Sequence, residues 1–218
     1  MNMLGIIRVL TTEDNQLLQE HSVLLNEKQG ILSESRCIPD QPYGIFNEAT
    51  YNVAEEKIVQ LAHDWAASQE IDALTISCAA DPALDLCRER IGLPIIGAGE
   101  AGALEACKLS EAVGVLGLTP EVPKRMRDIL GKRLVGQLVP EEVVNTTDLL
   151  EEDAIEKAVA AVKQLMEQGA EVILFACTGF STIHLKESLQ EEIHIPIIDL
   201  VEAQGRAYQN HLERRNGR

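Results

Sequence analysis

An internal repeat constrains the fold of this chain more than any other feature of its sequence. IDALTISCAADPALDLCRERIGLPIIGAGEAGA begins at residue 71, and AEVILFACTGFSTIHLKESLQEEIHIPIIDLVEAQG begins at residue 170. In each segment an acidic residue (Asp72 or Glu171) starts an apolar run that ends six residues later in a cysteine (Cys78 or Cys177). An amphipathic stretch, Pro-Ile-Ile and Glu-Ala then follow in the same order. The ordered series indicates a duplication and predicts two equivalent halves.

Short apolar runs alternate with longer amphipathic stretches, which is typical of an α/β domain with a largely parallel sheet. The helical pattern is clearest over residues 53–67 and 155–166. The runs expected to form strands are 4–10, 31–38, 73–78, 94–97, 113–118, 134–139, 171–177 and 195–199.

The repeat and the alternation together predict two pseudo-symmetric lobes, with the active site in the cleft between them. Each lobe is expected to hold a short, mostly parallel sheet flanked by helices. We expect lobe 1 to span residues 1–97, with a C-terminal helix over 200–218 packing back on it, and lobe 2 to span 98–199.

Composition excludes several classes of partner. The net charge of −16 and the 3% aromatic content argue against nucleic acid and anionic membranes, which bind basic patches and stacking side chains. No apolar stretch approaches the roughly 18 residues of a spanning helix, and MNMLGIIRVLTTED shows no basic leader or cleavage site. We expect a cytoplasmic protein with five reduced cysteines. Without C-x-x-C spacing or a Cys–His cluster, no metal site is predicted.

Cys78 and Cys177 occupy matched places at the ends of two strands. Two thiols that face each other across a small cleft can invert a carbon centre, because one removes a proton and the other returns one to the opposite face. A helix N-terminus lowers the pKa of a cysteine from about 8.5. Helix starts are predicted after both thiols, with Asp81 as the cap after Cys78 and Ser181 or Thr178 as the cap after Cys177. Packing is the commoner role of a single buried cysteine, but the matched pair favours catalysis. The unmatched cysteines are expected to be structural: Cys37, Cys87 and Cys107.

Other candidate site residues share a place at strand ends or in the loop over residues 38–52, which could cover the cleft. Backbone N–H groups after the two cysteines could hold an enolate oxygen. Threonine hydroxyls at strand ends could bind a substrate carbonyl or cap a helix. Asp81 could orient a group in the cleft, although capping a helix is the commoner role. The predicted substrate-binding residues are Thr11, Thr12, Tyr43, Gly44, Ala79, Asp81, Thr119, Thr178 and Gly179.

Four motifs resemble those of the aspartate/glutamate/hydantoin racemase superfamily, and within it the hydantoin racemase branch. They are CAADPAL (78–84), LPIIGAGEA (93–101), FACTGF (175–180) and IPIIDLVEA (195–203). The resemblance implies racemisation without a cofactor by two catalytic cysteines, Cys78 and Cys177. It also implies two α/β lobes around a small-molecule substrate, and usually a homo-oligomer.

Departures from the superfamily patterns bear on the substrate. Amino-acid racemases tend to have Cys-Asn-Thr and Cys-Thr-Glu, whereas this chain has Cys-Ala-Ala from Cys78 and Cys-Thr-Gly from Cys177. Hydantoin racemases tend to carry Asn-Pro-Asn-Thr after the first strand, whereas this chain has Leu-Thr-Thr-Glu over residues 10–13. These differences argue against free aspartate or glutamate and leave the exact ring open.

The sequence therefore predicts a racemase of 5-substituted hydantoins or of a related cyclic ureide such as allantoin. Three alternatives stay open: an aspartate/glutamate-type amino-acid racemase, a decarboxylase or cis–trans isomerase of small dicarboxylates, and a non-catalytic small-ligand-binding protein. An anionic substrate should show in the cleft as convergent backbone N–H groups or as an arginine, and Arg8 and Arg125 are the candidates near matched strand ends.

Overall fold

The computed structural model describes residues 2–217, and within them the chain forms two four-stranded parallel sheets. Each sheet follows the same order. The first is β2 (Ser33–Cys37), β1 (Leu4–Arg8), β3 (Ala73–Ser77), β4 (Ile95–Gly97), and the second is β6 (Leu134–Leu138), β5 (Val113–Leu116), β7 (Val172–Phe175), β8 (Ile197–Ile198). Every predicted run contains one of these strands. The predicted α/β fold with two pseudo-symmetric lobes is confirmed.

The central strands are apolar because helices cover both of their faces. All residues of β1, β3, β5 and β7 are buried, so these strands are mostly apolar rather than alternating. The buried polar exceptions are Arg8, Thr75 and Ser77. The edge strand β2 is polar, with the sequence SESRC, and most of its residues are half-buried.

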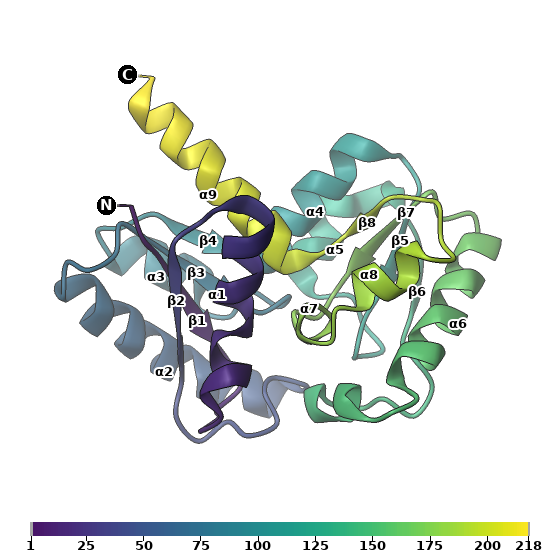
Figure 1. The fold of residues 1–218 in the computed structure, drawn as a ribbon, viewed down its shortest axis with the longest axis horizontal. Coiled ribbons are helices and arrows are strands. Elements are labelled where there is room, and N and C mark those ends of the chain that lie inside the picture. The colour runs from purple at the N-terminus through teal and green to yellow at the C-terminus, as the bar shows by residue number, and fades with distance from the viewer. Residues whose placement is uncertain (1, 218) are drawn as a thin grey trace.

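Helices connect the strands and flank the sheets (Figure 1). The helices are α1 (Asn15–Gln29), α2 (Glu48–Ala67), α3 (Leu84–Arg90), α4 (Ala98–Leu109), α5 (Lys124–Leu130), α6 (Ala154–Glu167), α7 (Gly179–Thr182), α8 (Leu185–Gln190) and α9 (Leu200–Asn216), with 3-10 turns η1 (Gly131–Arg133) and η2 (Thr146–Leu150). None of the helices within residues 2–217 is long and apolar enough to cross a membrane.

Helix α2 begins earlier than the apolar periodicity of 53–67 predicts. The Asn47 side chain accepts the N–H of Thr50, and the Thr50 hydroxyl accepts the N–H of Asn47. The two reciprocal bonds make a capping box. The helix therefore starts at Glu48 and takes up the end of the predicted loop over residues 38–52.

Helices α4 and α9 join the two lobes. Figure 1 shows α9, in yellow, running from the middle of the molecule past the first sheet. It packs on α1, β3 and β4 as well as on α4, and Tyr208 donates to Asp72 beside β3 over 2.8 Å. The exact division of the chain at residues 97/98 and 199/200 stays a prediction, and residues 1 and 218 lie outside the described part.

Candidate active site

Cys78 and Cys177 line a single cavity of about 790 Å³ between the two lobes. Cys78 directly follows β3 and Cys177 lies two residues after β7, so each thiol sits beyond the carboxyl end of an equivalent strand. Parallel sheets bind ligands at this end. Residues of both lobes line the cavity, and the duplication thus brings the two thiols to one place.

The loop after Cys177 directs N–H groups at its sulfur. The N–H of Gly179 donates to the Cys177 sulfur over 3.2 Å, and the N–H of Phe180 adds a second bond. The Thr146 hydroxyl and the positive charge of Arg8 also favour the thiolate. The same loop is fastened to the other lobe, because the Thr178 hydroxyl donates to the carbonyl of Ser77, next to Cys78, over 3.0 Å.

Burial raises the pKa of both thiols. The pKa of Cys78 rises to about 12, opposed by an N–H bond from Ala80, and the pKa of Cys177 rises to about 11. The lowered values expected from helix starts are therefore wrong, because the loss of water outweighs the N–H bonds. After Cys78 the geometry also differs from expectation, since α3 begins only at Leu84.

We expect both Cys78 and Cys177 to be alkylated slowly at neutral pH, because burial raises the pKa of each thiol and leaves little of it as the reactive thiolate. Both rates should still climb between pH 8 and 10, since both pKa values are raised. Peptide mass spectrometry after iodoacetamide treatment measures each rate, and the protein in urea is the control. A plateau below pH 8 at either thiol would contradict the raised pKa values.

Asp81 caps a different helix from the one predicted. Its fully buried carboxylate accepts the N–H groups of Gly99 (2.9 Å) and Glu100 (2.7 Å) at the start of α4, and Arg125 lies 4.0 Å away. Burial raises the pKa of this carboxyl to about 7 against these bonds. Asp81 faces the neighbouring groove rather than the cysteine cavity. Through these two bonds Asp81 holds the loop after Cys78 against α4, and it can therefore act on the site by positioning that loop.

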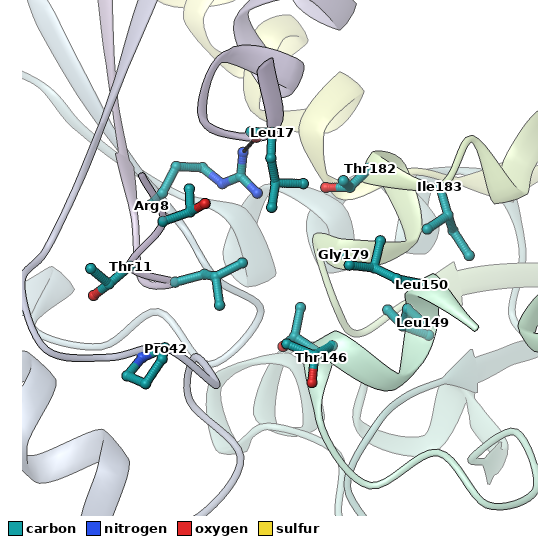
Figure 2. A pocket seen from close by; sticks show the side chains of 13 residues that line it. Arg8, Thr11, Leu17, Pro42, Thr146, Leu149, Leu150, Gly179, Thr182 and Ile183 are labelled. Atoms are coloured by element: carbon teal, nitrogen blue, oxygen red, sulfur yellow. Dashed lines mark hydrogen bonds between the residues drawn. The ribbon is translucent and has the colours of Figure 1, made fainter. Parts of the chain in front are cut away.

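The structure brings together most of the other predicted site residues. Those that line the cavity with the two cysteines are Gly44, Ala79, Thr119, Thr178 and Gly179. Thr11 and Thr12 line a smaller adjoining pocket instead (Figure 2). Tyr43 lines neither space and is 58% exposed. Residues 44–48 of the predicted covering loop line the cavity, and its role as a lid stays a prediction.

The two arginine candidates have different surroundings. Arg8, 5% exposed, lines the cavity and donates to the carbonyls of Leu17 and Leu18 at 3.1 and 3.2 Å. Arg125 lies in the neighbouring groove, where it pairs with Asp85 and Glu100. Arg8 is therefore the candidate that can meet a ligand in the cavity.

Two further residues at the site escaped the sequence analysis. Thr146 lies on η2 and lines the cavity beside Cys177. His21 is buried in α1, hydrogen-bonded to Ser77 (2.9 Å) and Thr182 (3.1 Å), and so links the two cysteine loops. Burial lowers its pKa well below the usual value. His21 lies 56 and 161 positions from its partners, and no local pattern marks such contacts.

Metal binding has no visible basis in the part of the chain that the structure describes. Among residues 2–217, no three histidine, cysteine, aspartate or glutamate side chains are grouped to hold a metal ion. The cavity offers thiols, backbone N–H groups and hydroxyls, and its wall also carries charged side chains: Arg8, Glu48, Glu121, Lys124 and Arg127.

Comparison with known proteins agrees with this arrangement of an α/β enzyme with thiols at its cleft. The family model described as Asp/Glu/Hydantoin racemase matches residues 16–207. The chain therefore belongs to the Asp/Glu/hydantoin racemase family, and by class it is an isomerase.

Individual relatives share part of the sequence. A hydantoin racemase of Paenarthrobacter aurescens is 29% identical over 168 residues, which cover 73% of this chain and 68% of that protein. A hydantoin racemase of Rhizobium meliloti is 31% identical over 144 residues, or 62% of this chain and 58% of that protein. The allantoin racemase from Klebsiella pneumoniae has the same fold, with a TM-score of 0.84 and 19% identity over 98% of this chain and 88% of that one.

Proposed function

We propose that this protein racemises 5-substituted hydantoins, or a related cyclic ureide such as allantoin, by proton transfer through two cysteines. The observation that carries the proposal is the placement of Cys78 and Cys177, from equivalent strands, on one cavity. The names of the relatives, hydantoin racemase and allantoin racemase, support this choice of substrate class.

In the proposed reaction one cysteine, as thiolate, takes the C5 proton and becomes a thiol. The other thiol then gives its proton to the opposite face of the carbanion and becomes the thiolate. The two groups have exchanged roles, so the enzyme is ready for the other enantiomer. The raised pKa values act in two directions: each thiolate is a stronger base toward a weak carbon acid, but less of it is present near pH 7.

A hydantoin ring makes this chemistry easier than a free amino acid does. The carbonyl next to C5 acidifies the C5 proton, and the resulting carbanion is delocalised as an enolate. The backbone N–H groups of the cysteine loops can stabilise the negative charge that develops. The α-proton of an amino-acid zwitterion is much less acidic, and its removal requires more stabilisation of the carbanion.

Arg8 favours a second candidate function. A buried guanidinium on the cavity wall can pair with a carboxylate, as an aspartate/glutamate-type racemase or an enzyme of small dicarboxylates would require. Its bonds to the carbonyls of Leu17 and Leu18 leave part of the guanidinium for such a ligand.

Solvent exchange distinguishes these functions. The protein is incubated in D₂O with single enantiomers of 5-methyl-, 5-isobutyl- and 5-benzylhydantoin, allantoin, aspartate and glutamate. We expect C5 deuteration and loss of optical rotation for a cyclic ureide, well above the enzyme-free rate. Exchange of the amino acids alone would instead support the second candidate. If no compound exchanges and none protects the thiols from alkylation, a non-catalytic role replaces both. A cytoplasmic location and a homo-oligomer stay predictions.

A further inference from the structure

A buried histidine of the first lobe contacts the chain on both sides of the cysteine cavity. His21 lies in α1 and is fully buried. Its Nδ1 atom lies 2.9 Å from the hydroxyl of Ser77, the residue before Cys78. Its Nε2 atom lies 3.1 Å from the hydroxyl of Thr182, at the end of α7, the helix after Cys177. One imidazole ring therefore joins the backbone segments that carry the two thiols.

A neutral imidazole suits these two partners. It has one donor nitrogen and one acceptor nitrogen, and a hydroxyl group can fill either role. Burial and the positive charge of Arg8 lower the pKa of His21, so the ring stays neutral and both hydrogen bonds can form. A buried polar group that loses its partner destabilises the fold, and each of the two bonds therefore constrains the segment to which it is made.

Sser77 is not held by His21 alone. The Thr178 hydroxyl donates to the carbonyl of Ser77 over 3.0 Å, and the Nε2 atom of Gln204, in α9, donates to the Ser77 hydroxyl over 3.3 Å. The backbone before Cys78 is thus fixed to the second lobe and to α9. Among these contacts, His21 is the one that extends from Ser77 to α7.

The second lobe makes a comparable contact in the opposite direction. Helix α5 follows β5 as α1 follows β1, and its Arg125 pairs with Asp85 of α3, the helix after Cys78. Each lobe thus reaches the helix after the other lobe's cysteine through the helix that follows its own first strand. The side chain of Asp85 is 69% exposed, and exposed ion pairs contribute little. The buried contact of His21 therefore constrains the two lobes more strongly.

We propose that His21 is a positioning residue that sets the separation of the two thiols across the substrate. The inference rests on the proposed function. His21 lines neither the cysteine cavity nor the smaller pocket beside it, so it acts through Ser77 and Thr182 rather than on the substrate. Inversion requires both thiols within reach of one carbon, whereas exchange on a single face requires only one. A displacement of about 1 Å between the two segments should therefore slow inversion much more than exchange.

The ratio of inversion to exchange tests this role. Single enantiomers of 5-benzylhydantoin and allantoin are incubated in D₂O with each variant. NMR measures deuterium uptake into the starting enantiomer, and chiral chromatography measures formation of the other enantiomer. His21→Leu has a similar side-chain volume and removes both hydrogen bonds. We expect inversion to fall by about 10- to 100-fold and exchange to stay within about threefold. A smaller fraction of folded protein would lower both rates equally and leave their ratio unchanged.

Thr182→Val and Thr182→Ser form a matched pair. Valine has the shape of threonine without its hydroxyl, so this variant removes only the bond between His21 and α7. We expect its ratio of inversion to exchange to fall by about threefold or more, and Thr182→Ser, which keeps a hydroxyl, to restore the wild-type ratio. Tyr208→Phe is the control for lost stability, because it removes a buried hydrogen bond to Asp72 at the opposite end of β3. It should lower the urea midpoint without changing the ratio.

Wild-type ratios in both His21→Leu and Thr182→Val would overturn the proposal. A reduced ratio in Tyr208→Phe would also overturn it, because the ratio would then follow the loss of stability. If His21→Leu does not fold, Thr182→Val decides the question by itself. A folded wild type that neither exchanges nor racemises these rings would instead refute the proposed function.

Discussion

Replacing either Cys78 or Cys177 with serine is expected to abolish racemisation but to leave proton exchange on one enantiomer. In the proposed mechanism each thiol serves one face of the reacting carbon, so a single variant can still remove and return a proton on the remaining face. We expect racemisation to fall by about 10²- to 10⁴-fold, because a serine hydroxyl is a far weaker acid than a thiol. Chiral chromatography measures racemisation, and NMR in D₂O follows the C5 proton of each enantiomer separately.

The two serine variants should retain exchange on opposite enantiomers. Cys107→Ser is the matched control, because the Cys107 thiol bonds to the carbonyl of Ile129 (3.7 Å) and lines no part of the cavity. This control should keep the wild-type rate. Racemisation that survives in Cys78→Ser or Cys177→Ser, or exchange of the same enantiomer by both, would contradict a mechanism with one thiol on each face.

Gly99→Ala is expected to damage the site from outside the cavity. Gly99 lies in the first turn of α4, and a Cβ atom there would overlap the carbonyl oxygen of Ala79, next to Cys78. A backbone oxygen cannot rotate away, so the loop that carries Cys78 must shift. We expect kcat/KM to fall by about 100-fold and the free energy of unfolding to drop by about 1–3 kcal/mol. Kinetics and urea unfolding measure the two effects.

Gly92→Ala controls for the loss of glycine itself. A Cβ atom at Gly92 would meet no other heavy atom within 4 Å, so its activity and its unfolding curve should match those of the wild type. If Gly99→Ala also matched the wild type in both measurements, the close contact between α4 and the loop after Cys78 would matter neither for kcat/KM nor for the free energy of unfolding.

Sequence patterns were sufficient for the architecture, because its signals are local. The strands β1, β3, β5 and β7 are mostly apolar runs, and burial on both faces of a parallel sheet favours such runs. The duplication then predicts that both sheets share one strand order, since two copies of one sequence fold alike. The order itself and the bulge in the β5–β6 pair come only from the structure. The same argument places Cys78 and Cys177 at equivalent strand ends without any knowledge of three-dimensional contacts.

Asp81 shows where local signals mislead. Asp81 followed by Pro82 has the sequence of a helix start, and a cap for the next helix was the natural prediction. In the structure the carboxylate instead accepts two N–H groups of α4, 18 and 19 positions further along the chain. A capping side chain binds whichever free N–H groups the fold brings to it, and the sequence does not state which these are.

The sequence by itself determined the two lobes, their strands and the pair of cysteines. The tertiary structure decided the direction of the thiol pKa shifts, the partners of His21, the place of Thr146 and the smaller pocket beside the cavity. The physical reason is the range of the interactions. Apolar runs and repeats are properties of neighbouring residues, whereas burial of a thiol and the walls of a pocket exist only after distant segments have packed together.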